Sequence, residues 1–157
     1  MPNNSVSRLE GVFEAWRQCD NAYVQLLRQW GLSLNTVWAL EYLVRCPNGV
    51  EPAVLAEDTH MLRQTITVVL NDLENRGYIQ RVFHRTDHRK KVIHLTAEGK
   101  VFASRVLRAI SDAEQEAVSA LTAEEQQRLL DYSRRFSQEF VRKVSDITSG
   151  KKEDSIR

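Results

Sequence analysis

Five basic side chains are concentrated between Tyr78 and His94, where the only acidic residue is Asp87, so this segment carries a net charge of +4. Arginine and lysine at this density can contact the phosphates of a polyanion such as nucleic acid. On an exposed hairpin, the same residues could instead serve only to maintain solubility. The whole chain has a formal net charge of +1, so charge alone does not separate these alternatives.

The residues around the basic segment predict the elements that position it. Short runs of β-branched and aromatic residues at 78–83 and 91–95 flank a polar turn, which is typical of a two-stranded hairpin. Directly before it, residues 63–76 place apolar side chains on one helical face. Gly77 follows this segment and is suited to the left-handed conformation that ends a helix. A helix is therefore expected to lead straight into the hairpin.

Further helices are predicted on both sides of this pair. Ser33 is a suitable N-cap for a helix, and Pro52 opens a short helix that follows it. Residues 5–31 carry an apolar stripe at steps of three and four, Thr96 begins another long helix, and Thr122 begins a capping box. A helix of about 25 residues spans nearly 40 Å, more than a domain of this size covers, which indicates a second subunit.

The order helix, short helix, helix and hairpin is that of a winged helix-turn-helix, in which the second helix of the pair fits the major groove of DNA. We therefore predict a mainly α fold with a small β-hairpin wing and long N- and C-terminal dimerisation helices. In this prediction residues 1–157 form one domain, with the winged helix-turn-helix at 33–95, dimerisation helices at 5–31 and 96–146, and a flexible tail at 147–157.

Other classes of protein find little support in the sequence. Cys19 and Cys46 lie 27 positions apart without a CxxC pair, so we expect no disulfide framework or zinc site, and a reduced, cytoplasmic location. The first residues lack the basic stretch and apolar core of a signal peptide, and no long apolar run occurs, so we expect no contact with a membrane. No enzyme motif occurs, so we expect neither catalysis nor a cofactor. The histidines lack metal-ligand spacing and are expected at the surface or near phosphates; they are His60, His84, His88 and His94.

Several short motifs, taken in order, resemble those of the MarR (multiple antibiotic resistance regulator) family over about residues 6–144. They are Leu55-Ala56-Glu57, Thr65-Ile66-Thr67, Leu73-Glu74-Asn75-Arg76-Gly77-Tyr78-Ile79, Asp87-His88-Arg89-Lys90 and Leu95-Thr96-Ala97-Glu98-Gly99. Each motif alone is weak, but their order and spacing together are specific. The resemblance implies a homodimer that binds double-stranded DNA.

The resemblance also implies which residues contact DNA. The helix at 63–76 becomes the recognition helix, with groove-facing candidates Gln64, Thr65, Thr67, Val68 and Asn71. The family's wing signature, an aspartate two residues before an arginine, matches Asp87 and Arg89. The arginine then enters the minor groove while the carboxylate orients it. Phosphate contacts are expected from Arg63, Arg81, Arg85, Lys90 and Lys91.

Two positions depart from the family pattern. Position 68 is polar or basic in many members, whereas Val68 can contact a thymine methyl but cannot make a bidentate contact with guanine. Leu62 occupies the position before the recognition helix where Ser, Asp or Asn would satisfy a free backbone N–H. We expect this helix end to be soft, or to be capped by a DNA phosphate.

Aromatic residues on the first two helices lie where the family forms an effector cleft: Trp16, Tyr23, Trp38 and Tyr42. They could simply be core residues. If they line a cleft, an aromatic or amphipathic ligand fits it, and Arg17 or Arg45 could bind its carboxylate. Cys19 lies near the position of the reactive cysteine in the peroxide-sensing branch of the family, although a free cysteine is often a small buried apolar residue.

The function expected from these observations is transcriptional regulation. The resemblance implies a homodimer on an inverted-repeat operator, acting as a repressor that a small-molecule effector releases. Two alternatives stay open at this point. One is a redox-sensing regulator that acts through Cys19, and the other is a winged helix used only to bind other proteins.

Overall fold

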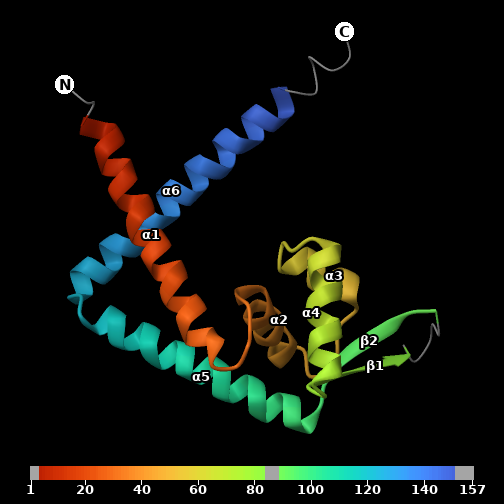
Figure 1. The fold of residues 1–157 in the computed structure, drawn as a ribbon. Coiled ribbons are helices and arrows are strands. Elements are labelled where there is room, and N and C mark those ends of the chain that lie inside the picture. Colours follow the sequence, from red (N-terminus) through yellow and green to blue (C-terminus); the bar gives the residue numbers. More distant parts are fainter. Residues whose placement is uncertain (1–3, 84–88, 151–157) are drawn as a thin grey trace. The chain divides into compact units, whose positions relative to one another are not determined.

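The computed structural model describes residues 4–83 and 89–150 (Figure 1). Within these residues it contains six helices and two strands: α1 (Asn4–Arg28), α2 (Leu34–Arg45), α3 (Pro52–Asp58), α4 (Arg63–Asn75), β1 (Ile79–Phe83), β2 (Lys91–Leu95), α5 (Ala97–Ser119) and α6 (Ala123–Gly150). The chain divides into two compact units, residues 1–111 and 112–157, with the boundary inside α5. The mainly α fold with a hairpin wing is confirmed.

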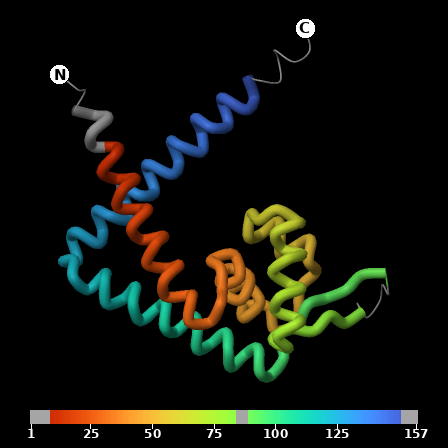
Figure 2. The backbone as a smooth tube through the Cα atoms, in the orientation of Figure 1, coloured from red at the N-terminus to blue at the C-terminus, as the bar shows by residue number. Residues whose placement is uncertain are grey.

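The first unit is built around a helical core. α2 packs against α4, α3 packs against α4, and the start of the hairpin contacts the end of α4. Figure 2 follows the backbone through α2, α3 and α4 into the hairpin without a long connection. The fully buried residues come from all of these elements and include Leu40, Leu55, Leu73 and Ile93. The core therefore fixes the orientation of α4, with the burial of aliphatic side chains as the stabilising term.

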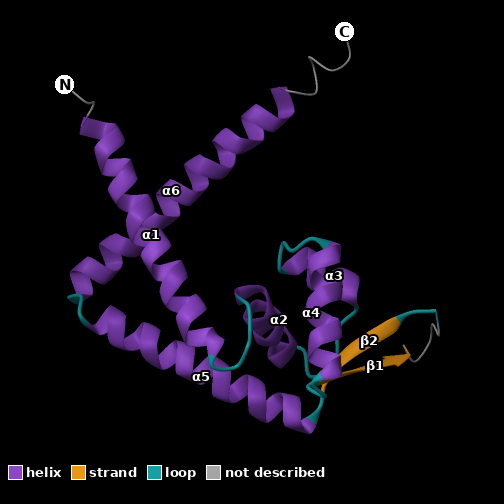
Figure 3. Cartoon of the chain, in the orientation of Figure 1, coloured by secondary structure: helices purple, strands orange, loops and turns teal. Residues whose placement is uncertain are grey.

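The wing, residues 79–95, consists of β1, β2 and their connection, and its strands are orange in Figure 3. The strands pair antiparallel, with Ile79 opposite Leu95 and Val82 opposite Val92. A further bridge, absent from the sequence-based prediction, joins Ile93 to Val50, the residue before Glu51 and α3. The wing is thus attached to the helices along β2 as well as at its base.

Local sequence signals account for several helix ends. The Ser33 hydroxyl accepts a hydrogen bond from the backbone N–H of Thr36 at 3.2 Å, as expected of an N-cap. The Thr96 hydroxyl accepts from Gly99 N at 2.9 Å. Gly77 follows α4 with a φ of 75°, in the left-handed region. The predicted ends of these helices are therefore confirmed.

The predicted capping box at the start of α6 is also present. Thr122 N donates to the Glu125 carboxylate at 2.8 Å, and Glu125 N donates to the Thr122 hydroxyl at 3.3 Å. The hydrogen bond from the backbone of Thr122 holds the pKa of Glu125 below its usual value.

Two predicted boundaries need correction. The first long helix ends at Arg28 and not at residue 31, because Trp30 N and Leu32 N both donate to the carbonyl of Leu27, and Gly31 adopts a φ of 62°. The predicted flexible tail at 147–157 begins too early. Residues 147–150 belong to α6, where the Thr148 hydroxyl donates to the carbonyl of Val144 at 3.0 Å. Within α6, no proline or glycine occurs before Gly150.

The second unit contains the end of α5 and all of α6, and no residue of α6 is buried. Its exposed large apolar residues follow helical spacing and include Leu129, Phe136, Phe140, Val144 and Ile147. Such a stripe on a helix about 42 Å long normally packs against another element. Among the described residues, no helix is both long enough and apolar enough to cross a membrane.

Candidate nucleic-acid interface

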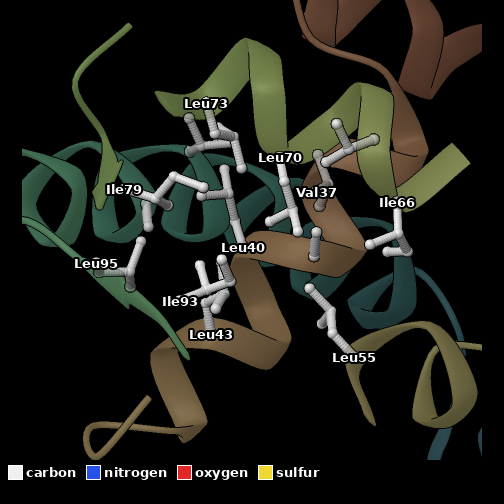
Figure 4. Packing of buried hydrophobic residues seen from close by; sticks show 14 of the residues in the cluster. Val37, Leu40, Leu43, Leu55, Ile66, Leu70, Leu73, Ile79, Ile93 and Leu95 are labelled. Carbon is white, nitrogen blue, oxygen red and sulfur yellow. The ribbon is translucent and has the colours of Figure 1, made fainter. Parts of the chain in front are cut away.

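α4 separates its side chains into two faces. Ile66, Val69, Leu70 and Leu73 are buried, and Figure 4 shows Ile66, Leu70 and Leu73 among the core side chains. At 100° per residue, the positions directly opposite this face are 64, 68, 71 and 75. The side chains there, Gln64, Val68, Asn71 and Asn75, are all exposed and are called the outer stripe below.

The predicted groove-facing residues do not all lie on the outer stripe. Gln64, Val68 and Asn71 do, and Val68 is 69% exposed. Thr65 is half-buried at one flank of the helix. Thr67 lies at the other flank, where its hydroxyl donates to the carbonyl of Arg63 at 2.9 Å. The two threonines therefore flank the face that carries the other three candidates.

The N-terminus of α4 lacks a side-chain cap. Leu62 is the N-cap residue, its side chain makes no capping hydrogen bond, and it is 76% exposed. The first backbone N–H groups of a helix have no partner within the helix and carry partial positive charge. This end of α4 can therefore accept an anion from outside the chain, and the missing cap predicted from the sequence is confirmed.

Arg81 has an internal role in the structure. Its guanidinium pairs with the carboxylate of Glu74 on α4 and also donates to Asn71 Oδ1 at 2.8 Å. The Arg81 side chain is 23% exposed. These contacts differ from the solvent-facing phosphate contact predicted from the sequence, because they join β1 to α4 and engage the side-chain oxygen of Asn71.

The predicted phosphate contacts outside α4 belong to the wing. Arg89, Lys90 and Lys91 are exposed. Lys90 pairs with Glu51 at 2.9 Å, and the Lys91 ammonium lies 5.8 Å from the centre of the Phe83 ring. The other wing candidates, Arg85 and Asp87, lie outside the described residues, so the pairing of Asp87 with Arg89 stays a prediction.

Arg76 is a positioning residue that sequence reasoning missed. It follows the last residue of α4, and its guanidinium donates to the carbonyl oxygens of Trp30 at 2.8 Å and Gly31 at 3.0 Å. Asp72 accepts a third hydrogen bond from Arg76 Nε, at 3.0 Å. The end of α4 is thus fixed to the segment that follows α1. An arginine near a helix C-terminus is an ordinary sequence feature, and nothing in the sequence indicates a partner 45 residues away.

The predicted effector residues lie on α1 and α2, and their joint site stays a prediction. Trp16, Cys19 and Trp38 are exposed, and Tyr23 is half-buried against the core. Tyr42 instead lines a shallow hollow of about 700 Å³ between the ends of α2 and α3. The complete lining is Tyr42, Arg45, Cys46, Glu57, Asp58 and His60.

Within this hollow the Tyr42 hydroxyl donates to the carboxylate of Asp58. This hydrogen bond to the neutral phenol, together with the negative charge of Asp58, raises the pKa of Tyr42 to about 12. Among the described residues, no group of three His, Cys, Asp or Glu side chains could hold a metal ion, and His84 and His88 lie outside them.

The helix pair α3–α4, followed by a hairpin attached to the same core, defines a winged helix-turn-helix protein. A sequence model described as the MarR family matches residues 30–90. This match agrees with the resemblance to the MarR family that the motifs predicted.

Individual proteins agree with this similarity. The chain is 29% identical over 87 residues to the transcriptional regulator HosA of Escherichia coli O127:H6, a match that covers 55% of this chain and 64% of HosA. It is also similar to the crystal structure of the PcaV transcriptional regulator from Streptomyces coelicolor in complex with its natural ligand. That match has a TM-score of 0.66 and 26% identity, and it covers 79% of this chain and 89% of PcaV.

A further solved structure shows the same fold at lower identity. The MepR–DNA complex of S. aureus matches with a TM-score of 0.71 and 22% identity over 86% of this chain and 97% of MepR. The curated relative and PcaV are both transcriptional regulators, in agreement with the expectation that the chain is not an enzyme.

Proposed function

We propose that the protein is a homodimeric transcriptional regulator that binds double-stranded DNA through α4 and the wing. The observation that carries the proposal is the outer stripe of α4, which is exposed opposite a well-packed core. The wing that follows it carries the exposed basic residues Arg89, Lys90 and Lys91. A polar helix face of this kind can read base edges, while the basic residues neutralise phosphates. The fold it shares with MepR, which was solved as a DNA complex, supports the proposal.

The dimer is supported by the exposed apolar stripe on α6. Phe136 and Phe140 stack with ring centres 5.9 Å apart on this helix, and both are exposed. A second copy of the chain would bury such a stripe, and a two-fold dimer would present two α4 helices to an inverted-repeat operator. Sedimentation of the wild type and Phe136→Asp tests this. A dimer that the charged variant weakens supports the proposal, and a monomeric wild type contradicts it.

Repression and release by a small aromatic or amphipathic effector are the finer part of the proposal. A ligand that changes the separation of the two α4 helices would disturb their fit to half-sites about one helical turn apart. The ligand complex of PcaV supports a small-molecule effector. The cytoplasmic location predicted from the sequence belongs to the same proposal.

DNA binding is tested by a titration of the full chain against the region upstream of its own gene, at several salt concentrations, with unrelated DNA as the control. Binding that is tight, salt-sensitive and selective is the expected result. Equal and weak binding to both DNAs, for protein freed of bound ligand and kept reduced, would contradict a specific regulator. It would favour a winged helix that binds other proteins.

A redox-sensing regulator is the second candidate, and the exposure of Cys19 favours it because an oxidant can reach the thiol. The test is operator binding before and after mild oxidation, for the wild type and Cys19→Ser. Loss of binding in the wild type alone would support redox sensing. Equal behaviour of the two proteins would exclude it, and Cys46→Ser is the matched control.

A further inference from the structure

The outer stripe of α4 has one apolar member, Val68, between Gln64 and Asn71. We propose that Val68 reads the methyl group of a thymine, so that each half-site of the operator contains a required T·A pair under the second turn of α4. The inference rests on the proposed function, and it names a chemical feature of the DNA that the site selects.

The structure leaves few other groups on this face to select the same base. The side-chain oxygen of Asn71 already accepts a hydrogen bond from Arg81 at 2.8 Å, and the bidentate contact of an asparagine with adenine needs that oxygen as well as the amide N–H groups. The hydroxyl of Thr67 donates to the carbonyl of Arg63. On the N-terminal half of the helix, where recognition helices contact bases, the outer stripe contains Gln64 and Val68.

The chemistry of Val68 determines what it can select. Its isopropyl group has no donor or acceptor, and the thymine C5 methyl is the only methyl group on the major-groove edge of the four bases. Opposite guanine, cytosine or adenine, Val68 would remove water from a polar edge without replacing its hydrogen bond. The preference therefore has two sources, which are a favourable methyl contact and the exclusion of polar edges.

Helix propensity does not favour valine at this position. Val68 is 69% exposed in the middle of α4, where lysine, glutamine or alanine would favour the helix more because a β-branched side chain loses rotamer freedom there. The free protein gains little from this residue, because its side chain is not part of the core. A contact that Val68 makes only in the DNA complex explains why a valine occupies this position.

The test removes the methyl group from the DNA and the isopropyl group from the protein. Sites are first selected from random duplexes by the full-length wild type, and each thymine of the selected site is then replaced by deoxyuridine, which pairs identically but lacks the methyl. Because one buried methyl changes affinity about fourfold, one position per half-site should weaken wild-type binding about fourfold, or about fifteenfold when both half-sites are changed. Val68→Ala should discriminate between the thymine and deoxyuridine sites less than the wild type does, because its shorter side chain buries less of the methyl.

A gain of specificity provides a second readout. Selection with Val68→Arg should replace the required T·A pair with G·C at the same position, because arginine can donate two hydrogen bonds to guanine. Lys100→Arg, an exposed position on α5, is the control and should select the wild-type site. Circular dichroism checks that each variant is folded.

The failures of the two proposals are distinguishable. If the wild type enriches no sequence, the proposed function and this inference are both overturned. If it enriches a site at which no deoxyuridine weakens binding, or at which Val68→Ala is weakened as much as the wild type, only the reading by Val68 is overturned.

Discussion

The guanidinium of Arg76 donates to the carbonyl oxygen of Trp30 across 2.8 Å and so fixes the end of α4 to the segment that follows α1. A second hydrogen bond, to the carbonyl of Gly31, completes a two-pronged contact that only a planar, forked side chain can make. The helix proposed to read DNA is therefore held at its C-terminus by the chain that leaves the long N-terminal helix. In the proposed dimer, a movement of α1 would reach α4 through this contact.

Replacement of Arg76 is expected to destabilise the protein. Arg76→Gln loses the charge-assisted hydrogen bonds to two carbonyl oxygens, which together should lower the free energy of unfolding by about 1.5–3 kcal/mol. Urea denaturation measures the change. The matched control is Arg28→Gln, which removes an exposed arginine near the end of α1 and should change stability by less than about 0.5 kcal/mol. Equal effects of the two substitutions would argue against the contact.

The contrast between Arg76 and Gly77 shows what could be predicted from the sequence. Gly77 ends α4 by local backbone geometry, so the apolar pattern before it and the glycine itself were enough to place the helix end. The partners of Arg76 lie 45 and 46 residues away, and the contact depends on how the core orients two helices. Local sequence patterns predict individual helices and strands. Side-chain contacts between these elements depend on how the elements pack against one another, which the local patterns do not contain.

The same distinction applies to the candidate site. The apolar face of α4 correctly identified Gln64, Val68 and Asn71 as exposed, because helical periodicity determines which side chains oppose the core. It could not show that Arg81 pairs with Glu74, because that contact joins a strand to a helix. The resemblance implied a phosphate contact for Arg81, whereas in the structure its guanidinium pairs with the carboxylate of Glu74.

Tyr42 should make stability depend on pH in the alkaline range. The pKa of Tyr42 is raised from 10.0 to about 12 by the hydrogen bond to Asp58, so folding favours the neutral phenol. The contribution of this group is therefore complete below pH 10 and is lost as the pH rises from 10 to 12. Tyr42→Phe should remove this part of the pH dependence, as measured by chemical denaturation at several pH values.

An absorbance titration of the tyrosines checks the same pair independently. The ionisation near pH 12 in the wild type should be missing in Tyr42→Phe and present in the control Tyr132→Phe, whose ring is exposed on α6. Asp58→Asn should lower the pKa of Tyr42 toward its ordinary value, because it removes the negative charge and the strongest acceptor. An unchanged titration in Asp58→Asn would contradict the hydrogen bond.

Gly99 should not tolerate a side chain, because a Cβ at this position would lie 1.8 Å from the carbonyl oxygen of Tyr78. Gly99→Ala must displace the backbone between α4 and β1, at a cost of at least about 1–3 kcal/mol by thermal or urea unfolding. Gly11 on α1 is the control, since nothing lies within 4 Å of its Cβ position. Gly11→Ala should increase stability by about 0.5–1 kcal/mol, as expected for an exposed helical glycine. Destabilisation of both variants by the same amount would contradict the close approach.

Gln64 should determine part of the sequence preference. It lies on the outer stripe in the first turn of α4, and a glutamine can make two hydrogen bonds with adenine, so Gln64→Ala should lose about 1–3 kcal/mol of discrimination at one base pair. Thr65→Ala should also alter the selected sites, by a smaller amount, since Thr65 is half-buried at the flank. Selection from random duplexes measures both, and Asn75→Ala at the far end of the stripe is the control. If Gln64→Ala and Thr65→Ala select the wild-type site, the assignment of the groove-facing side of α4 is wrong.

Arg89 should contribute to DNA binding through the electrostatic potential of the minor groove. It is exposed on the wing, and a guanidinium in a narrow minor groove is stabilised by the negative potential there. Arg89→Ala should weaken operator binding by about 1–3 kcal/mol and reduce the slope of affinity against salt by about one. Arg45→Ala makes the same change in charge at a residue that pairs with Glu41 on α2, and it should leave both quantities unchanged. If the two variants bind with equal affinity at fixed salt, the wing has no part in recognition and α4 must account for all of it.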